Sequence, residues 1–353
     1  LHSFPTRRSS DFDLTIMKKL FLSLVALMAA TVSFAQNTLV ATLTHGEDIS
    51  MYYGVNALRS AMNAAVSGDV INLSGGAFAC DQITKAVTLR GTGIDDPLPT
   101  YISGDYTINI PSSDTNRLSM EGIRNTGIIT MKGTCNSIYF LKCQFHRFTY
   151  NSSSAIKNTI FVDCKITGDD FDLSGNSSVQ FINSYVTGFY NRSENTATAF
   201  FLNCVIRPTS NGYSSANLAG NIKSSQLLNC IVCFKSSSRT PFPSSTIILN
   251  CLSVNYTGAF SDSQINRYCK YASSFEEVFK DFTGTYSDSQ TFELTDEAKA
   301  TFLGDDGTEM GMYGGVMPYT STPSYPQITT MNVANKTTAD GKLSVEIGVS
   351  AAE

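Results

Sequence analysis

The sequence has few charged side chains, and basic residues are scarcer than acidic ones. Asp, Glu, Lys and Arg make up 16% of the 353 residues, with 25 Lys and Arg against 30 Asp and Glu, so the net charge is −5. A partner such as nucleic acid is held by a basic face that gathers its phosphates. The shortage of Lys and Arg therefore argues against a nucleic-acid partner and against a site that needs a broad cationic groove.

Long apolar runs are missing beyond residue 35, so we expect no membrane-spanning segment in the mature chain, since a spanning helix takes about 20 apolar residues. The one marked run, at residues 20–30, follows Met17 and two lysines and leads into small residues that end at Ala35. This order is typical of a secretory signal peptide cleaved after Ala35. It predicts a protein that is secreted, periplasmic or on the cell surface. Residues 1–16 match no targeting pattern and look like upstream, non-native sequence.

The cysteines do not follow a disulfide framework, although nine of them in an exported chain would usually suggest one. Nine is an odd number, and most of the cysteines recur at one position of a repeat. The repeat comprises six segments, at residues 140–145, 161–166, 181–186, 201–206, 227–232 and 248–253, with a weaker copy at 119–124. Their fourth positions, 20 to 26 residues apart, are Gly122, Cys143, Cys164, Ser184, Cys204, Cys230 and Cys251.

A period of this length is typical of either a leucine-rich repeat or a β-helix. The segments between the repeats are rich in Gly, Ser and Asn, as at residues 174–178 and 209–215. These residues favour turns over the helical return of a leucine-rich repeat. The sequence therefore predicts an all-β protein, a single-stranded right-handed parallel β-helix with coils of about 20–26 residues. Stacked coils would lie about 4.8 Å apart.

The third and fourth positions of the repeat have physical explanations. The third is Asn in four copies and Asp163 in another, and Asn tolerates the left-handed backbone that a sharp bend needs. Stacked asparagines would then bond from coil to coil as a ladder. Cysteine is small and apolar enough for the inner corner that follows, and Ser184 shows that sulfur is not required. We favour buried thiols, with occasional disulfides as the alternative; Cys230 and Cys233 lack the second pair that a metal site needs.

The segment before the repeats predicts a cap for the first coil. Val55, Leu58, Met62 and Ala65 fall at helical spacing and define one apolar face. A helix over the first coil would cover a core and strand edges that an open solenoid end exposes. After residue 255 the spacing fades; residues 275–279 suggest a short helix, while the terminal segments suggest turns, a linker and a strand.

At this point a family resemblance can be stated. Residues 57–73, with Gly68 and Asp69 before an apolar strand, and residues 83–93, ending in Gly-Thr-Gly, resemble the opening of pectin-lyase-like β-helix proteins. The chain is most similar to uncharacterised exported members of gut Bacteroidetes type, over residues 38–255. Because that superfamily contains lyases, hydrolases, adhesins and structural proteins, the resemblance implies a fold and not an activity.

These observations divide the chain into six segments. We expect an upstream segment at 1–16, a signal peptide at 17–35, an N-terminal strand and capping helix at 36–69, β-helix coils at 70–255, a C-terminal cap packed on the coils at 256–320, and a linker with a terminal strand at 321–353.

The C-terminal cap is predicted from an apolar stripe. The first two positions of each repeat are both apolar, and adjacent strand residues face opposite sides. The fifth position also becomes apolar late in the chain, at Val205, Ile231 and Leu252. Such an outward stripe would exceed what monomers usually expose, so we expect residues 256–320, or else a partner chain, to cover it.

One acidic turn suggests chemistry. Asp169, Asp170 and Asp172 follow Gly168, and Gly-Asp-Asp resembles the acidic motif of polygalacturonase-type hydrolases, where paired carboxylates serve as acid and base. The companion motifs of that family, Asn-Thr-Asp, Gly-His-Gly and Arg-Ile-Lys, are missing. As a lyase site, the three aspartates would bind Ca²⁺, and Lys142, Arg147 or Lys165 would act as the base. A plain turn with solvated charges explains the same residues, so they are weak candidates.

Other candidates are weaker still. Arg207 and Pro208 do not complete the Arg-x-Pro-x-x-Arg element of pectate lyases, and His146 has no triad partner and is expected to point outward. Residues 305–309 lack the rest of an EF-hand loop and are expected to form a turn.

Three functions are compatible with these features. The first is a non-catalytic surface or secreted protein that binds polysaccharide or a cell-surface glycan, without a required cofactor, which the missing motifs and the Ser-, Thr-, Asn- and Tyr-rich exterior favour. The second is a polysaccharide lyase or glycoside hydrolase with a divergent site, which only the fold favours. The third is a structural or assembly component.

Overall fold

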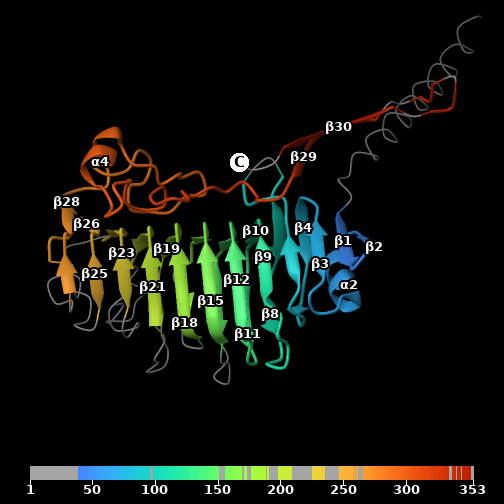
Figure 1. The fold of residues 1–353 in the computed structure, drawn as a ribbon, viewed down its shortest axis with the longest axis horizontal. Coiled ribbons are helices and arrows are strands. Elements are labelled where there is room, and N and C mark those ends of the chain that lie inside the picture. Colours follow the sequence, from blue (N-terminus) through green and yellow to red (C-terminus); the bar gives the residue numbers. More distant parts are fainter. Residues whose placement is uncertain are drawn as a thin grey trace, which may run out of the picture. The chain divides into compact units, whose positions relative to one another are not determined.

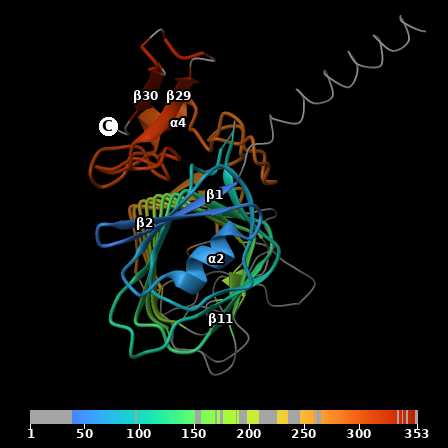
Figure 2. The same ribbon diagram turned by 90° about the vertical axis from the view of Figure 1, so that its right-hand side faces the viewer.

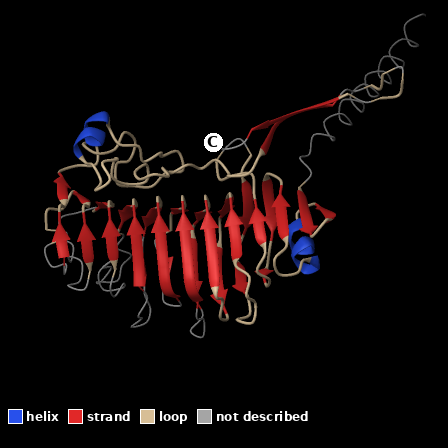
Figure 3. Cartoon of the chain, viewed as in Figure 1, coloured by secondary structure: helices blue, strands red, loops and turns tan. Residues whose placement is uncertain are grey.

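The computed structural model describes residues 39–350, except 96–97, 151–155, 169–170, 173–175, 188, 191–197, 209–224, 235–245, 259, 261–264, 334–335, 339 and 343. The predicted signal peptide lies outside these residues. The described chain forms a single-stranded parallel β-helix in which short strands of successive coils stack side by side (Figure 1). Strands and loops dominate, and helices are short (Figure 3). The predicted fold class is confirmed.

Three sheets run along the stacked coils. Sheet A, from one edge to the other, is β2 (Asp48–Tyr53), β1 (Val40–His45), β3 (Val70–Leu73), β6 (Thr88–Arg90), β9 (Leu118–Glu121), β12 (Ser137–Leu141), β15 (Ile156–Val162), β18 (Asn176–Ile182), β21 (Thr198–Leu202), β23 (Gln226–Leu228), β25 (Ile247–Leu249) and β27 (Ile265–Arg267). All neighbours in sheet A are parallel except β1, which is antiparallel to both β2 and β3.

Sheets B and C complete each coil. Sheet B is β4 (Gly76–Ala79), β7 (Thr100–Ser103), β10 (Ile123–Asn125), β13 (Gln144–Phe145), β16 (Lys165–Ile166), β19 (Tyr185–Thr187), β22 (Val205–Arg207), β24 (Ile231–Cys233), β26 (Leu252–Val254) and β28 (Lys270–Ala272). Sheet C is β5 (Gln82–Ile83), β8 (Tyr106–Asn109), β11 (Ile128–Lys132), β14 (Arg147–Tyr150), β17 (Phe171–Asp172) and β20 (Phe189–Tyr190). A separate antiparallel hairpin joins β29 (Gln327–Val333) and β30 (Val345–Ser350).

Stacked side chains fill the inside of the coils. The first position of the repeat points inward, and Phe161, Phe181 and Phe201 stack with ring centroids 4.9 Å apart and rings nearly parallel. Each of these rings is fully buried, and burying a Phe side chain contributes about 1.5–3 kcal/mol. The stack therefore ties each coil to the next through the core.

The third position forms the tight bend between sheets A and B, as the sequence predicts. We call these residues the corner row: Gly122, Lys142, Asp163, Asn183, Asn203, Asn229, Asn250 and Tyr268. All eight have positive φ angles, between 47° and 63°, which L-residues rarely adopt and Gly and Asn adopt most readily. The weak copy at 119–124 is shifted by one residue from its expected alignment, because Phe140 pairs with Met120 and Gly122 consequently lies at the third position.

The cysteines are free thiols, as the sequence favours. Eight of the nine are buried, and the corner thiols of Cys143 and Cys164 point toward backbone carbonyl oxygens at 3.2–3.5 Å. Burial raises the pKa of the Cys143 thiol to about 12, so the reactive thiolate is disfavoured.

A helix caps the first coil. Helix α2 (Ala57–Ala64) lies across the end of the coils (Figure 2) and buries Ala57, Leu58, Ala61 and Met62. Val55 lies outside the helix and is 53% exposed, so its expected place on the apolar face is wrong. Ala57 and Ala61 take its place because small side chains let the helix approach the core.

Residues 272–325, which we call the C-terminal cover, return along the corner between sheets A and B. They contain one short helix, α4 (Asp296–Thr301), whose N-cap is Thr295. The expected helix at 275–279 is a turn instead, since Phe279 bridges to Leu294. The turns expected near residues 305–307 and 313 are present.

The cover is anchored on the corner row, running opposite to the order of the coils. Asn250 Nδ2 donates to the Leu303 carbonyl and Asn229 Nδ2 to Asp305. Further back, Asn183 Nδ2 donates to the carbonyls of Met312 and Gly314, both at 2.8 Å. Lys142 Nζ then donates to the Thr322 carbonyl at 2.6 Å, and the Ser324 amide donates to Glu121 at 2.6 Å. Contact with the coils thus continues past residue 320, into the expected linker.

The corner asparagines bond more to the cover than to one another. One coil-to-coil amide bond is present among the described residues, from Asn250 Nδ2 to Asn229 Oδ1 at 3.1 Å. Asn183 and Asn250 also donate to backbone carbonyls of the cover, which have no strand partner in its irregular backbone, and Asn229 donates to the Asp305 carboxylate.

An apolar cluster lies under the cover. The fifth-position residues Tyr185, Val205, Ile231 and Leu252 pack with Phe282, Phe292, Leu294, Met310 and Met312, and the rings of Tyr185 and Phe292 stack 4.3 Å apart. The second-position residues behave differently, since Leu141 through Leu249 are half-buried on the outer face of sheet A. The cover therefore buries the fifth-position part of the apolar stripe and leaves the second-position part open.

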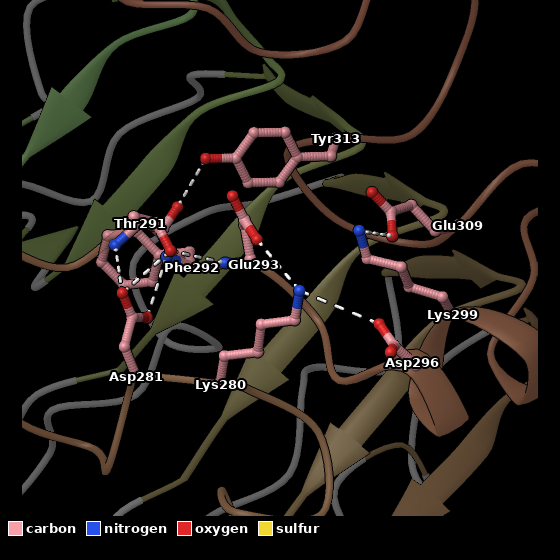
Figure 4. Close-up of polar contacts among 9 residues, drawn as sticks. All are labelled: Lys280, Asp281, Thr291, Phe292, Glu293, Asp296, Lys299, Glu309 and Tyr313. Carbon is pink, nitrogen blue, oxygen red and sulfur yellow. Dashed lines mark hydrogen bonds and ion pairs between the residues drawn. The ribbon is translucent and has the colours of Figure 1, made fainter.

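Polar contacts fix the cover's own shape (Figure 4). Asp281 accepts hydrogen bonds from the Thr291 amide and hydroxyl and from the Phe292 amide, at 2.6–3.2 Å. Tyr313 Oη donates to the Thr291 carbonyl at 2.8 Å, and Lys280 pairs with Glu293 at 3.2 Å. These bonds hold Phe292 against Tyr185.

Candidate functional site

The open outer face of sheet A carries two rows of side chains, half-buried except for the exposed Gln226. The residue just before each first position forms one row, in register across successive coils: Tyr139, Ile160, Gln180, Phe200, Gln226 and Ile247. The second row is Leu141, Val162, Ile182, Leu202, Leu228 and Leu249. Both point outward because strand residues alternate between faces. Since this face is open, a ligand can reach it.

A shallow hollow of about 250 Å³ lies on this face. It is centred on the part of the first row where Phe200 stands between the amide side chains of Gln180 and Gln226. It is lined by Ser178, Gln180, Thr198, Ala199, Phe200 and Gln226. Gln180 pairs with Phe200, and Phe200 with Gln226, on neighbouring coils. Ser178 and Thr198 form a second pair of neighbours along one side.

The hollow is chemically suited to an uncharged, polar ligand. None of its side chains ionises near neutral pH. Each glutamine amide offers both donors and an acceptor, and each hydroxyl offers one donor and two acceptor lone pairs. Phe200 supplies an apolar ring face between the two glutamines. Ligand pockets usually hold about 300–1,000 Å³, so this smaller hollow suits one unit of a chain whose remainder lies along the face.

The acidic turn predicted as a site cannot be assembled from the described residues. Asp169 and Asp170 lie outside them, and Asp172 is described only as part of strand β17, in sheet C. Lys165, one of the candidate bases, lies on β16 in sheet B. The structure thus places these two candidates on different sheets of the coil.

Lys165 is buried under the C-terminal cover. Its side chain is 5% exposed, and Nζ lies 5.7 Å from the centroid of the Tyr319 ring. Burial lowers the pKa of this lysine, while the charges of Asp95 and Asp288 oppose the shift. A lowered pKa would suit a base, but a polysaccharide cannot reach a side chain beneath the cover.

The polar residues at the fifth position of the earlier coils, Arg124 and Gln144, bind the cover. Arg124 pairs with Asp288, and Gln144 Nε2 donates to the same carboxylate at 3.1 Å. The Arg124 guanidinium also lies 5.5 Å from the centroid of the Tyr101 ring. These side chains have partners in the fold, so they are better explained as anchors than as a binding site.

Asp163 is the unusual member of the corner row. It is 6% exposed, and its Oδ1 has no hydrogen-bond partner. Burial raises the pKa of this carboxyl to about 7, although Lys142 and the Thr320 amide act in the opposite direction. The cover encloses this carboxyl group. Its protonation is therefore expected to change the stability of the fold and not the binding of a ligand.

His146 and the turn at residues 305–309 show no features of a catalytic or metal-binding site. His146 is exposed, as expected. Within the described ranges, no group of three His, Cys, Asp or Glu residues is placed to hold a metal ion. Asp305 and Asp306 lie in a turn, where Asp306 accepts from the Thr308 amide and hydroxyl.

Sequence reasoning missed the hollow. The sequence did contain the information for part of the hollow. Phe181 and Phe201 occupy the same repeat position and point inward, so the residues just before them, Gln180 and Phe200, point outward and lie side by side. Their grouping with Gln226 depends on the coil that contains residues 209–224, whose greater length hides the register.

No protein-family model matches the chain, and no curated protein matches it. No helix among the described residues is both long and apolar enough to cross a membrane.

Proposed function

We propose that this chain is an exported, non-catalytic protein of pectin-lyase-like type that binds a glycan on the outer face of sheet A. The observation that carries the proposal is the hollow around Phe200, where an aromatic ring lies between two glutamines and beside Ser178 and Thr198. Sugar rings present apolar C–H faces and a rim of hydroxyls, which match a ring face and neutral hydrogen-bonding groups.

The absence of charged side chains from the hollow restricts the class of glycan that it can bind. A uronate-rich polysaccharide carries one carboxylate per acidic sugar and would require cations in its site. The hollow has none, so a neutral glycan fits better. This choice agrees with the net charge of −5, which repels an anionic polymer.

Binding can be measured by affinity electrophoresis and isothermal titration against neutral and uronate-containing polysaccharides. We expect retention by a neutral glycan, with Phe200→Ala weakening it about tenfold or more, as loss of a stacked aromatic does. Thr88→Ala is the matched control, because Thr88 lies in the same outward row at the N-terminal part of sheet A. Equal binding by Phe200→Ala and the parent chain would refute the proposed site.

Catalysis is a separate question with its own readout. The same polysaccharides, incubated with and without Ca²⁺, would be followed by unsaturated-uronate absorbance and by reducing ends. We expect no product. Turnover that is lost in Asp169→Ala or Asp170→Ala would instead establish a lyase or hydrolase.

A further inference from the structure

Both ends of sheet A present an open strand edge. Strand β2 is the first strand of this sheet and β27 the last, and no strand in the described part of the chain pairs with their outer sides. An open edge leaves a row of backbone N–H and C=O groups available to another chain. Proteins usually blunt such edges with charges, proline or a covering segment, so the residues on these two strands are informative.

The β2 edge is apolar. Ile49, Met51 and Tyr53 alternate along the strand and are 65%, 58% and 62% exposed. They point to the outer side of sheet A, because they pair with the outward Thr44, Thr42 and Val40. Helix α2 closes the core at this end, but it leaves the β2 edge uncovered.

The β27 end exposes aromatic and basic side chains. Tyr268, the last member of the corner row, is 80% exposed and has a φ of 61°. A bulky residue in this conformation is strained, and such strain points to a function at its site. Arg267, Lys270 and Tyr271 beside it are exposed as well.

The two edges fit each other in direction. Strand β2 is antiparallel to β1, which is antiparallel to β3, so β2 runs the same way as β3. Parallel pairing from β3 through β25 to β27 keeps that direction along the whole sheet. A second copy can therefore stack its β2 on β27 as another parallel coil.

The register of the sheet fixes the contacts of such a stack. Ser50 pairs with Leu43 and Leu43 with Ile71, and the row that continues from Ile71 ends at Asn266. Continuing this register places Met51 of one copy beside Arg267 of the next, and Tyr52 beside Tyr268. The ends also differ in charge, with exposed Glu47 and Asp48 near β2 and exposed Arg267 and Lys270 near β27.

We infer that this chain assembles head to tail with further copies of itself, through parallel pairing of β2 with β27. The contact is heterologous, so it can continue into a linear polymer. Charge favours opposite ends over like ends, because two β27 ends would bring Arg267 and Lys270 of both copies together.

Sedimentation velocity across a concentration series of the purified chain tests the inference. The parent chain is expected to form oligomers of increasing size. Met51→Lys, which puts a second cation beside Arg267, is expected to weaken association at least about tenfold, since opposed like charges are strongly unfavourable. Met51→Glu is expected to retain it. Val316→Lys, at a cover residue that is 97% exposed, is the control for an added surface charge.

Mixing experiments test the heterologous geometry. Met51→Lys keeps a normal β27 end and Arg267→Glu keeps a normal β2 end, so each variant alone is expected to associate weakly. In their mixture the two normal ends pair with each other and the two changed ends carry opposite charges, so the mixture is expected to form polymers in which the variants alternate. Combining both changes in one chain restores opposite charges and is expected to restore polymers. Tyr268→Asn, which suits the left-handed backbone better, is expected to raise the melting temperature and yet weaken assembly.

Three outcomes would overturn the inference. A parent chain that remains monomeric at all concentrations has no such interface. A dimer that is insensitive to Met51→Lys but lost in Arg267→Glu is a contact between like ends. Equal effects of Val316→Lys and Met51→Lys would show that added charge alone, and not the β2 edge, controls association.

Discussion

Asp163 shows how one atom's difference in the corner row changes the chemistry of a coil. Its neighbour Asn183 donates two hydrogen bonds to cover carbonyls, and a carboxylate cannot donate. A neutral carboxylic acid can, and burial holds the pKa of Asp163 at about 7. The Asp163 side chain therefore resembles the neighbouring asparagines in hydrogen-bonding ability only when its carboxyl group is protonated.

The first prediction concerns stability and pH at this residue. The native state holds the Asp163 proton up to about pH 7, whereas the unfolded chain loses it near pH 4, so stability falls as pH rises through that interval. Asp163→Asn removes the titration. We expect it to raise the unfolding free energy by roughly 1–3 kcal/mol at pH 8, with no gain at pH 4. Urea unfolding at the two pH values measures both, and an equal gain at both would contradict the mechanism.

The thiols give a second prediction at the residue scale. Cys269 is half-buried, whereas the other eight cysteines are buried, and reactivity requires an accessible thiolate. We expect a thiol reagent to modify one cysteine in the native protein and nine in denaturant. Cys269→Ser should leave none reactive under native conditions. Modification of several thiols in the native state would mean that the coils open readily.

The corner row and the fold were predictable because both follow from a local rule repeated many times. A repeated corner, with Asn at the third position of four coils and a small Cys or Ser after it, specifies a bend and an inner corner, whatever the distant sequence does. The hollow and the cover's contacts were harder to predict. Gln180, Phe200 and Gln226 become neighbours only through the register of separate coils, and Ser324 meets Glu121 across 203 residues.

At the scale of elements, the cover depends on close approach to the corner row. Gly315 has a φ of 84°, and a Cβ atom there would lie 2.3 Å from Asn203 Nδ2. The turn at 275–279 shows that tertiary contacts determine local structure more than propensity does, since Phe279 bridges to Leu294 within the cover.

Gly315→Ala is therefore expected to loosen the cover while leaving the coils intact. The clash and the strained backbone together should cost about 1–3 kcal/mol. Limited proteolysis should cleave residues 303–325 faster in this variant, and Gly341→Ala, a positive-φ glycine with open space around it, is the control for strain alone. Equal cleavage of the two variants would mean that the close contact with Asn203 is unimportant.

At the scale of the whole unit, the cover separates two apolar surfaces of the coils. It buries Tyr185, Val205, Ile231 and Leu252, while the outer face of sheet A stays open. Removing residues 256–353 would expose the first surface, a contiguous apolar patch of the kind that soluble monomers rarely expose. We expect this truncation to aggregate, as measured by light scattering, and a soluble product with β-rich circular dichroism would show that the coils need no cover.

The direction of the cover also has a mechanical consequence. Its contacts follow the coils in reverse, from Leu303 on Asn250 to Ser324 on Glu121. A force that pulls on the C-terminus therefore loads the bond between Ser324 and Glu121 first, and then each earlier anchor in turn. The anchors would open one after another from Ser324 back to Leu303, and the last coil would not be drawn out of the stack until the anchor at Asn250 had separated.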